Sequence, residues 1–310
     1  MKATVELPAA SCSVLARDRQ EAVQASALTS SRFLLLEVPG PWGRSALTES
    51  QLDPGVAQRL AGQAESAGAR IILIRRPGRP PSARAAAPGP AWAVADTSPG
   101  IELIQWGSWL DPADLLGIDL GARLTTAARS SGPQRVALVC TNARRDRCCA
   151  LLGRPVAAAV AAAPGWDTWE CSHLGGHRFA ANLLLLPAGQ MFGQLGPESA
   201  VAVLRRFDKG EIVLRHHRGR CGQLPVVQAA LHAAADRLGD SRVGAVTARS
   251  WRVAGAAWQV EVTHWPDRGQ PATYQLRMTR AEQEPAALSC ADQELKPAVH
   301  YSVAGFTRLR

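Results

Sequence analysis

The sequence predicts an α/β protein built from two modules in tandem. Its 310 residues correspond to roughly two domains of about 150 residues each. Hydrophobic residues make up 46% and charged residues 20% of the chain, which is typical of a globular protein and excludes collagen-like, disordered and coiled-coil chains. Short apolar runs and helical segments also follow one another in the same order in both halves.

In the first half, an apolar run over 33–38 predicts a strand that ends at Pro39-Gly40-Pro41. Asp53 is a suitable N-cap for a helix from about 54 to 67, and Gly68 is suited to its end. The other expected elements are a strand over 71–74, a loop over 77–90, strands over 92–95 and 101–105, and a short helix over 111–120.

The second half repeats this order. Pro155 occupies a position suited to the first turn of a helix over 155–163, because its missing N–H costs nothing there. The expected strands are 136–140, 168–171, 182–186 and 191–195, and the further expected helices are 198–207 and 225–238. Each half therefore reads β-α-β, loop, β-β-α, which is close to a thioredoxin-like fold and suggests two tandem thioredoxin-like modules.

Composition shifts divide the chain into four segments. The expected units are an N-terminal thioredoxin-like module (1–122), a linker (123–134), a second thioredoxin-like module that carries the site described below (135–238), and a small β-rich appendage (239–310).

The charge and the cysteines of the chain indicate which kinds of partner and which cellular compartment to expect. The net charge of +9 comes almost entirely from arginines spread along the chain, so nucleic-acid binding is disfavoured against an acidic protein partner. The longest apolar runs, 156–163 and 183–186, are too short to span a bilayer. Seven cysteines, an odd number, do not suggest a secreted disulfide framework and predict a cytoplasmic protein with metal or redox chemistry.

Four ligand-type residues lie close together in the second module. Cys140 ends a strand, Cys149 follows it, and His173 and His177 lie on one loop, in the pattern C-x8-C-x23-H-x3-H. Thiolates and imidazoles are ligands that zinc and iron favour. Gly175-Gly176 indicates a tight loop rather than a regular helix. The pattern predicts a metal site.

Several kinds of site remain open at this point. The spacing matches neither a zinc finger nor a Rieske centre, but the same residues suit a structural Cys2His2 zinc module that acts through protein contacts. A thiol enzyme that uses Cys148-Cys149 or Cys171 is disfavoured, because no C-x-x-C motif follows a strand.

The motifs around these residues resemble those of the sucrase/ferredoxin-like family. The resemblance extends over about 12–235 and rests on the segments 38–43, 139–149, 170–180, 218–220 and Leu224-Pro225. It implies a [2Fe-2S] cluster with Cys140 and Cys149 on one iron and His173 and His177 on the other. It implies a non-enzymatic one-electron carrier, in which Cys148 and Cys171 are neighbours of the cluster. No carboxylate pair suggests glycoside hydrolysis.

The resemblance also suggests what surrounds such a cluster. Positive charge favours the reduced state, and the candidates are Arg144, Arg145, Arg147 and Arg178. Gly175 and Gly176 would let backbone N–H groups approach the sulfides. Because an iron-bound imidazole exchanges a proton as the charge on the iron changes, we expect electron and proton transfer to be coupled. The expected partner is a redox protein with an acidic docking surface.

Overall fold

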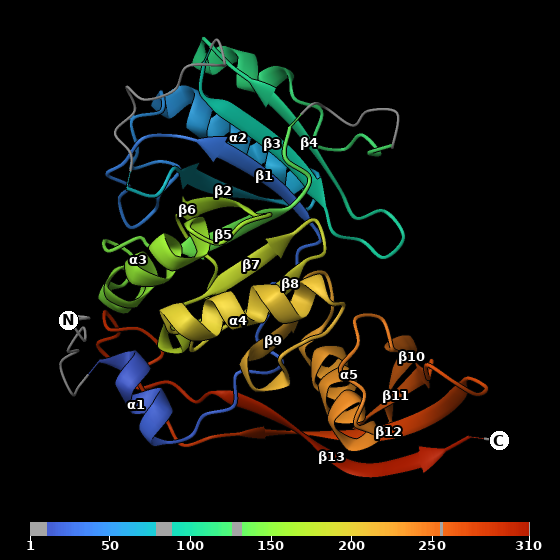
Figure 1. Cartoon of the computed structure of the whole chain (residues 1–310). Coiled ribbons are helices and arrows are strands. Elements are labelled where there is room, and N and C mark those ends of the chain that lie inside the picture. Colours follow the sequence, from blue (N-terminus) through green and yellow to red (C-terminus); the bar gives the residue numbers. More distant parts are fainter. Residues whose placement is uncertain (1–10, 79–88, 126–131, 255–256, 310) are drawn as a thin grey trace.

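The computed structural model describes residues 11–78, 89–125, 132–254 and 257–309. A nine-stranded sheet has the strand order β4-β3-β1-β2-β6-β5-β7-β8-β9, and a second sheet has the order β10-β11-β12-β13. The predicted mixed α/β class is confirmed. Figure 1 shows the strands of the first half at the top, those of the second half in the middle, and the second sheet at the lower right.

The first half contains most of the elements expected from its sequence, preceded by a helix, α1 (Cys12–Asp18), that was not expected. The expected elements are β1 (Arg32–Glu37), α2 (Pro54–Ser66), β2 (Ala69–Arg75), β3 (Ala91–Asp96), β4 (Leu103–Ser108) and the 3-10 helix η2 (Pro112–Gly117). Asp53 caps α2 as predicted, because its carboxylate accepts the N–H of Val56 at 2.9 Å. Most of the loop expected over 77–90 and half of the linker expected over 123–134 lie outside the described residues.

The second half follows the same succession. Its elements are β5 (Val136–Cys140), α3 (Arg147–Ala161), β6 (Asp167–Cys171), η4 (His177–Phe179), β7 (Leu183–Leu186), β8 (Gln190–Phe192), α4 (Pro197–Asp208), η5 (Leu214–His216), β9 (His217–Arg220) and α5 (Pro225–Leu238).

The predicted start of helix α3 at Pro155 is wrong. The helix begins two turns earlier, at Arg147, because the buried Asp146 carboxylate accepts the N–H of Cys148 at 2.8 Å and caps it. Pro155 lies inside the helix, where the buried apolar face outweighs the hydrogen bond that proline cannot donate. As a result, Cys148 and Cys149 lie on the first helical turn and not in a loop.

The two halves share one strand order and one sheet. The orders are β2-β1-β3-β4 and β6-β5-β7-β8, and in each half the first two strands are parallel while the third pairs antiparallel with the first. The halves join where β2 pairs with β6, with Ile74 opposite Cys171. The domain boundaries set out above stay a prediction.

Successive side chains along each strand point to opposite faces of this sheet, and both faces are covered by apolar clusters. Leu34 on β1 and Val139 on β5 lie on the face that packs against α2 in the first half and against α3 and α4 in the second. Phe33 and Cys140, on the same two strands, point to the opposite face, where one apolar cluster runs through both halves. Cys149 and Cys171 belong to this cluster, so the predicted ligands lie at the edge of a shared core.

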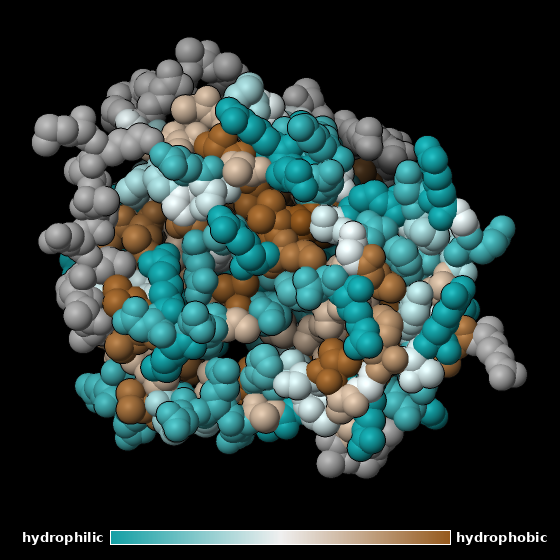
Figure 2. All heavy atoms as spheres, turned by 60° about the horizontal axis from the view of Figure 1, so that its bottom comes forward, coloured by the Kyte–Doolittle hydropathy of each residue, from teal (hydrophilic) through white to brown (hydrophobic). Residues whose placement is uncertain are grey.

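The second sheet consists of β10 (Val246–Ala254), β11 (Ala257–His264), β12 (Ala272–Glu282) and β13 (Val299–Arg308), of which β10 was not expected from the sequence. Helix α5 packs on it through an apolar cluster that includes Ala230 and Val260. The side of the molecule that is lowest in Figure 1 carries mostly hydrophilic side chains, with apolar groups between them near the middle (Figure 2). None of the helices that the structure describes has both the length and the apolar composition to cross a bilayer.

Candidate metal centre

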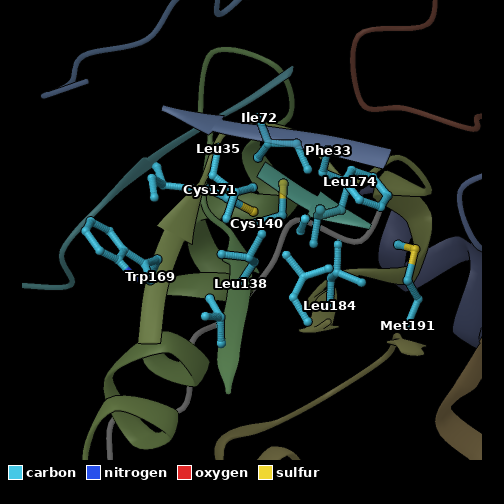
Figure 3. Close-up of a cluster of buried hydrophobic side chains, with 14 of the residues drawn as sticks. Phe33, Leu35, Ile72, Leu138, Cys140, Trp169, Cys171, Leu174, Leu184 and Met191 are labelled. Atoms are coloured by element: carbon cyan, nitrogen blue, oxygen red, sulfur yellow. The ribbon is translucent and has the colours of Figure 1, made fainter. Parts of the chain in front are cut away.

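The candidate centre lies where three elements of the second half meet. Cys140 is the last residue of β5, Cys171 is the last residue of the parallel strand β6, and the two residues are paired in register. Cys149 lies on the first turn of α3, which follows β5 directly. The carboxyl ends of parallel strands and the N-terminus of the next helix are a common place for ligand sites in α/β proteins. Figure 3 shows the sulfurs of Cys140 and Cys171 among the apolar side chains of the core.

The four ligand candidates come together as a closed ring of contacts. Cys149 Sγ lies 3.3 Å from His177 Nδ1, and the rings of His173 and His177 stack with their centroids 4.8 Å apart. The side chains of Cys149 and His173 both lie close enough to the Cys140 thiol to lower its pKa. The two cysteines therefore form one side of the ring and the two histidines the opposite side.

The thiols at the centre titrate as a group. The hydrogen bond from Cys149, then that from Cys171, holds the pKa of Cys140 well below its usual range, although burial opposes this. The same contact with Cys140, together with burial, raises the pKa of Cys149. Burial, followed by the charge of His173, lowers the pKa of His177 and favours its neutral, metal-binding form. Of the thiols at this centre, that of Cys140 thus loses its proton most readily.

Cys148 and Cys171 differ in their relation to this centre. Cys171 belongs to it, since it hydrogen-bonds to Cys140, and burial raises its own pKa. Cys148 instead points away, toward Cys12 and Cys290, whose sulfurs lie 3.7 and 3.3 Å from its own. Consecutive residues of one helical turn therefore present their thiols to two different clusters.

The loop that carries both histidines is held by a buried arginine. Gly175 and Gly176 have φ values of 67° and 63°, in the left-handed region that favours glycine. Arg218, only 1% exposed, donates to the carbonyl of Gly175 at 3.1 Å and to Asn182 Oδ1 at 2.9 Å. It also binds the hydroxyl and the carbonyl of Ser26. From the sequence alone, His216-His217 with the arginines at 215, 218 and 220 predicts an exposed basic strand end. That prediction is wrong for Arg218, which is buried.

The arginines expected around the centre are distributed unevenly. Arg144 and Arg147 are exposed, whereas Arg145 is half-buried and its charge contributes to lowering the pKa of His177. Arg178 pairs with Glu21 at 2.6 Å. The cations whose charges act on the Cys140 thiol from within the protein are Arg218 and Arg70. Nothing in the sequence singles out Arg70, and Arg218 belongs only to a segment that carries the family resemblance and to the predicted basic strand end.

The geometry of Gly176 supports a specific prediction. A Cβ at this position would lie 2.6 Å from Arg218 Nη2, in addition to the cost of about 1–2 kcal/mol for a left-handed non-glycine residue. We expect Gly176→Ala to displace the histidine loop and to lower metal content severalfold. Gly210→Ala is the matched control, because Gly210 has φ +77° but nothing within 4 Å of the added atom. Equal metal content in the two variants, measured by elemental analysis, would contradict the role given to this contact.

The donor set fits the [2Fe-2S] group that the sequence suggests. Two thiols and two imidazoles converge, with the two cysteines on one side of the site and the two histidines on the other. This arrangement fits a cluster in which two cysteines would bind one iron and two histidines the other. His173 Nδ1 is buried and has no hydrogen-bond partner among the described residues. A buried ring nitrogen of this kind is stabilised when it binds a metal.

Comparison with known proteins identifies the family of the chain. The sucrase/ferredoxin-like family matches residues 23–219, which include all four ligand candidates and Arg218. Searches of curated proteins and of solved structures give no match to the chain. Because the matched region spans more than half of the 310 residues and contains the whole ring of contacts, the chain belongs to the sucrase/ferredoxin-like family.

Proposed function

We propose that this protein is a one-electron carrier that holds a [2Fe-2S] cluster through Cys140, Cys149, His173 and His177. The observation that supports this most strongly is the ring of contacts in which two cysteines face two histidines. When bound, a cluster of this type takes up and gives back one electron. The protein supplies the Cys140 thiol with its lowered pKa, the buried Arg218 and the half-buried Arg70 as cations, and the apolar shell that keeps water from the sulfurs.

The strand order supports a tandem of thioredoxin-like modules as the scaffold. Each half contains a parallel pair connected by a helix, followed by two antiparallel strands on the side of its first strand. In the second half the connecting helix carries Cys149 on its first turn, so a thiol lies beside the end of β5. The first half has no cysteine on its corresponding helix, α2.

The histidine side of the centre is the side from which electrons would leave. His173 is half-buried, whereas Cys140 and Cys149 are buried almost completely. The exposed Arg144 and Arg147 lie on the segment that leads into α3. A redox protein with an acidic surface would be attracted to this basic segment, and a reducing cytoplasm would keep the thiols available.

Redox titration tests this function directly. Anaerobically purified protein should lose its visible absorption on addition of about one electron per chain and regain it on reoxidation. Arg144→Glu/Arg147→Glu should leave this titration unchanged and slow electron exchange with an acidic ferredoxin-type partner. Metal-loaded protein that cannot be reduced would instead favour the structural Cys2His2 zinc module.

The coupling of electron and proton transfer is a further prediction. Negative charge added by reduction raises the pKa of a bound imidazole, so reduction takes up a proton between the two pKa values. The midpoint potential should then fall by about 59 mV per pH unit as pH rises. Protein-film voltammetry of the wild type and of His177→Cys, which lacks one of the two rings, measures this slope. A pH-independent potential in the wild type would contradict the coupling.

A further inference from the structure

Three cysteines and one carboxylate form a second cluster, on the other side of the α3 first turn. The sulfurs of Cys12, Cys148 and Cys290 lie 3.7, 3.3 and 3.5 Å from one another. Asp146 places its two carboxylate oxygens 3.9 and 3.7 Å from Cys12 Sγ. All four potential ligand atoms lie within 4.8 Å of one another.

These spacings fit a single tetrahedral ion. With Zn–S bonds of about 2.3 Å, a tetrahedron places its sulfurs roughly 3.8 Å apart, close to the distances in this cluster. A disulfide would draw two sulfurs to about 2 Å and leave the third aside, whereas here all three are nearly equidistant. We propose that Cys12, Cys148, Cys290 and Asp146 bind one zinc ion.

The surroundings of Asp146 provide a second, independent observation. The carboxylate is 3% exposed, and no arginine or lysine in the described ranges forms an ion pair with it. A buried carboxylate next to three thiols is costly unless a cation compensates it. Zinc would supply that cation. The sequence alone favours a salt bridge between Asp146 and one of the arginines next to it, but no such pair forms among the described residues.

Hydrogen bonds already orient the ligands. Asp146 Oδ1 accepts the N–H of Cys148, and Oδ2 accepts the N–H of Cys290 at 2.8 Å and the Ser289 hydroxyl at 2.9 Å. The backbone N–H of Cys12 donates to the sulfur of Cys290 at 3.4 Å. Each carboxylate oxygen can accept two bonds, so Oδ1 keeps a lone pair for the metal. Such outer contacts hold metal ligands in position.

The ion would join three distant parts of the chain. Cys12 begins α1, Cys148 lies on α3, and Cys290 lies on a segment between β12 and β13 whose pairing is limited to an isolated bridge. Helix α1 in turn packs on η4, which carries His177, and Arg17 of α1 donates to the carbonyl of Ala180 at 2.9 Å. Zinc at this position would therefore keep α1 and the segment around Cys290 closed over the electron-transfer centre. Cys12 and Cys290 lie outside the region matched by the family.

Zinc analysis of anaerobically purified, zinc-supplemented protein tests the proposal. We expect about one zinc per chain in the wild type, and at least a tenfold loss of zinc affinity in Cys12→Ser, Cys148→Ser and Cys290→Ser. Asp146→Asn, which retains an N-cap side chain, should bind zinc more weakly while remaining folded. Cobalt(II) added to the zinc-free wild type should give the thiolate charge-transfer bands of a tetrahedral site.

Two controls separate this site from the electron-transfer centre. Cys140→Ser removes a ligand of that centre and should keep the zinc, and Cys221→Ser removes a buried thiol that belongs to neither cluster. The proposal is overturned if the reduced wild type takes up no zinc, or if zinc is lost with Cys140→Ser instead.

Discussion

Replacing Cys149 with serine should abolish the visible absorption of the purified protein, whereas replacing its neighbour Cys148 should leave that absorption intact. Cys149 Sγ contacts His177 Nδ1 and hydrogen-bonds to Cys140, so its removal breaks the ring at two points. Cys148 faces the cluster with Cys12 and Cys290 instead. We expect iron content to fall at least tenfold in Cys149→Ser and to change little in Cys148→Ser.

Zinc content provides the internal control for this pair. Cys148→Ser should lose the zinc that Cys149→Ser retains, and Cys149→Ser should lose the iron that Cys148→Ser retains. The metal that each variant keeps shows that the variant is still folded. The opposite pattern of iron loss would move the ligand by one residue along α3 and would show that the helical turn presents its thiols differently.

Loss of Arg218 should have the largest effect on stability. Its guanidinium binds the Ser26 hydroxyl and carbonyl, the Gly175 carbonyl and Asn182 Oδ1, all at buried or half-buried positions. Each unsatisfied buried acceptor costs about 1–3 kcal/mol, and relief of the cost of burying the charge offsets part of this. We expect Arg218→Met to lower the free energy of unfolding by about 3 kcal/mol and to loosen the histidine loop.

Urea denaturation of the metal-free proteins measures this effect. Arg205→Met, which removes an exposed arginine from α4, should change the free energy of unfolding by less than about 0.5 kcal/mol. Arg218→Lys should recover only part of the lost free energy of unfolding. The lysine ammonium lacks the planar, forked guanidinium with which Arg218 reaches acceptors on three segments. A midpoint for Arg218→Met equal to that of Arg205→Met would show that the hydrogen bonds of Arg218 do not hold the loop.

Local patterns in the sequence were enough to select the four ligand candidates. Cys140 ends an apolar run, and His173 and His177 flank a Gly-Gly pair, so strand end and tight loop could both be inferred. The order of strands and helices likewise gave the α/β class. These features depend on neighbours within a few residues along the chain, which is the range over which sequence patterns are informative.

What the sequence did not reveal depends on contacts between distant segments. The start of α3 was misplaced because Pro155 was given more weight than Asp146, whose value as a cap depends on its burial against Ser289 and Cys290. Arg218 looked like an exposed basic residue because its partners come from three separate segments. Cys12 and Cys290 are 278 positions apart, so no spacing rule could connect them.

The most direct test of the proposed electron-transfer centre is the iron, acid-labile sulfide and zinc content of anaerobically purified wild-type protein. We predict about two irons and about two sulfides per chain, with zinc confined to the second cluster. Two zinc ions per chain with no sulfide, after reconstitution with iron and sulfide has been attempted, would contradict the proposed [2Fe-2S] carrier.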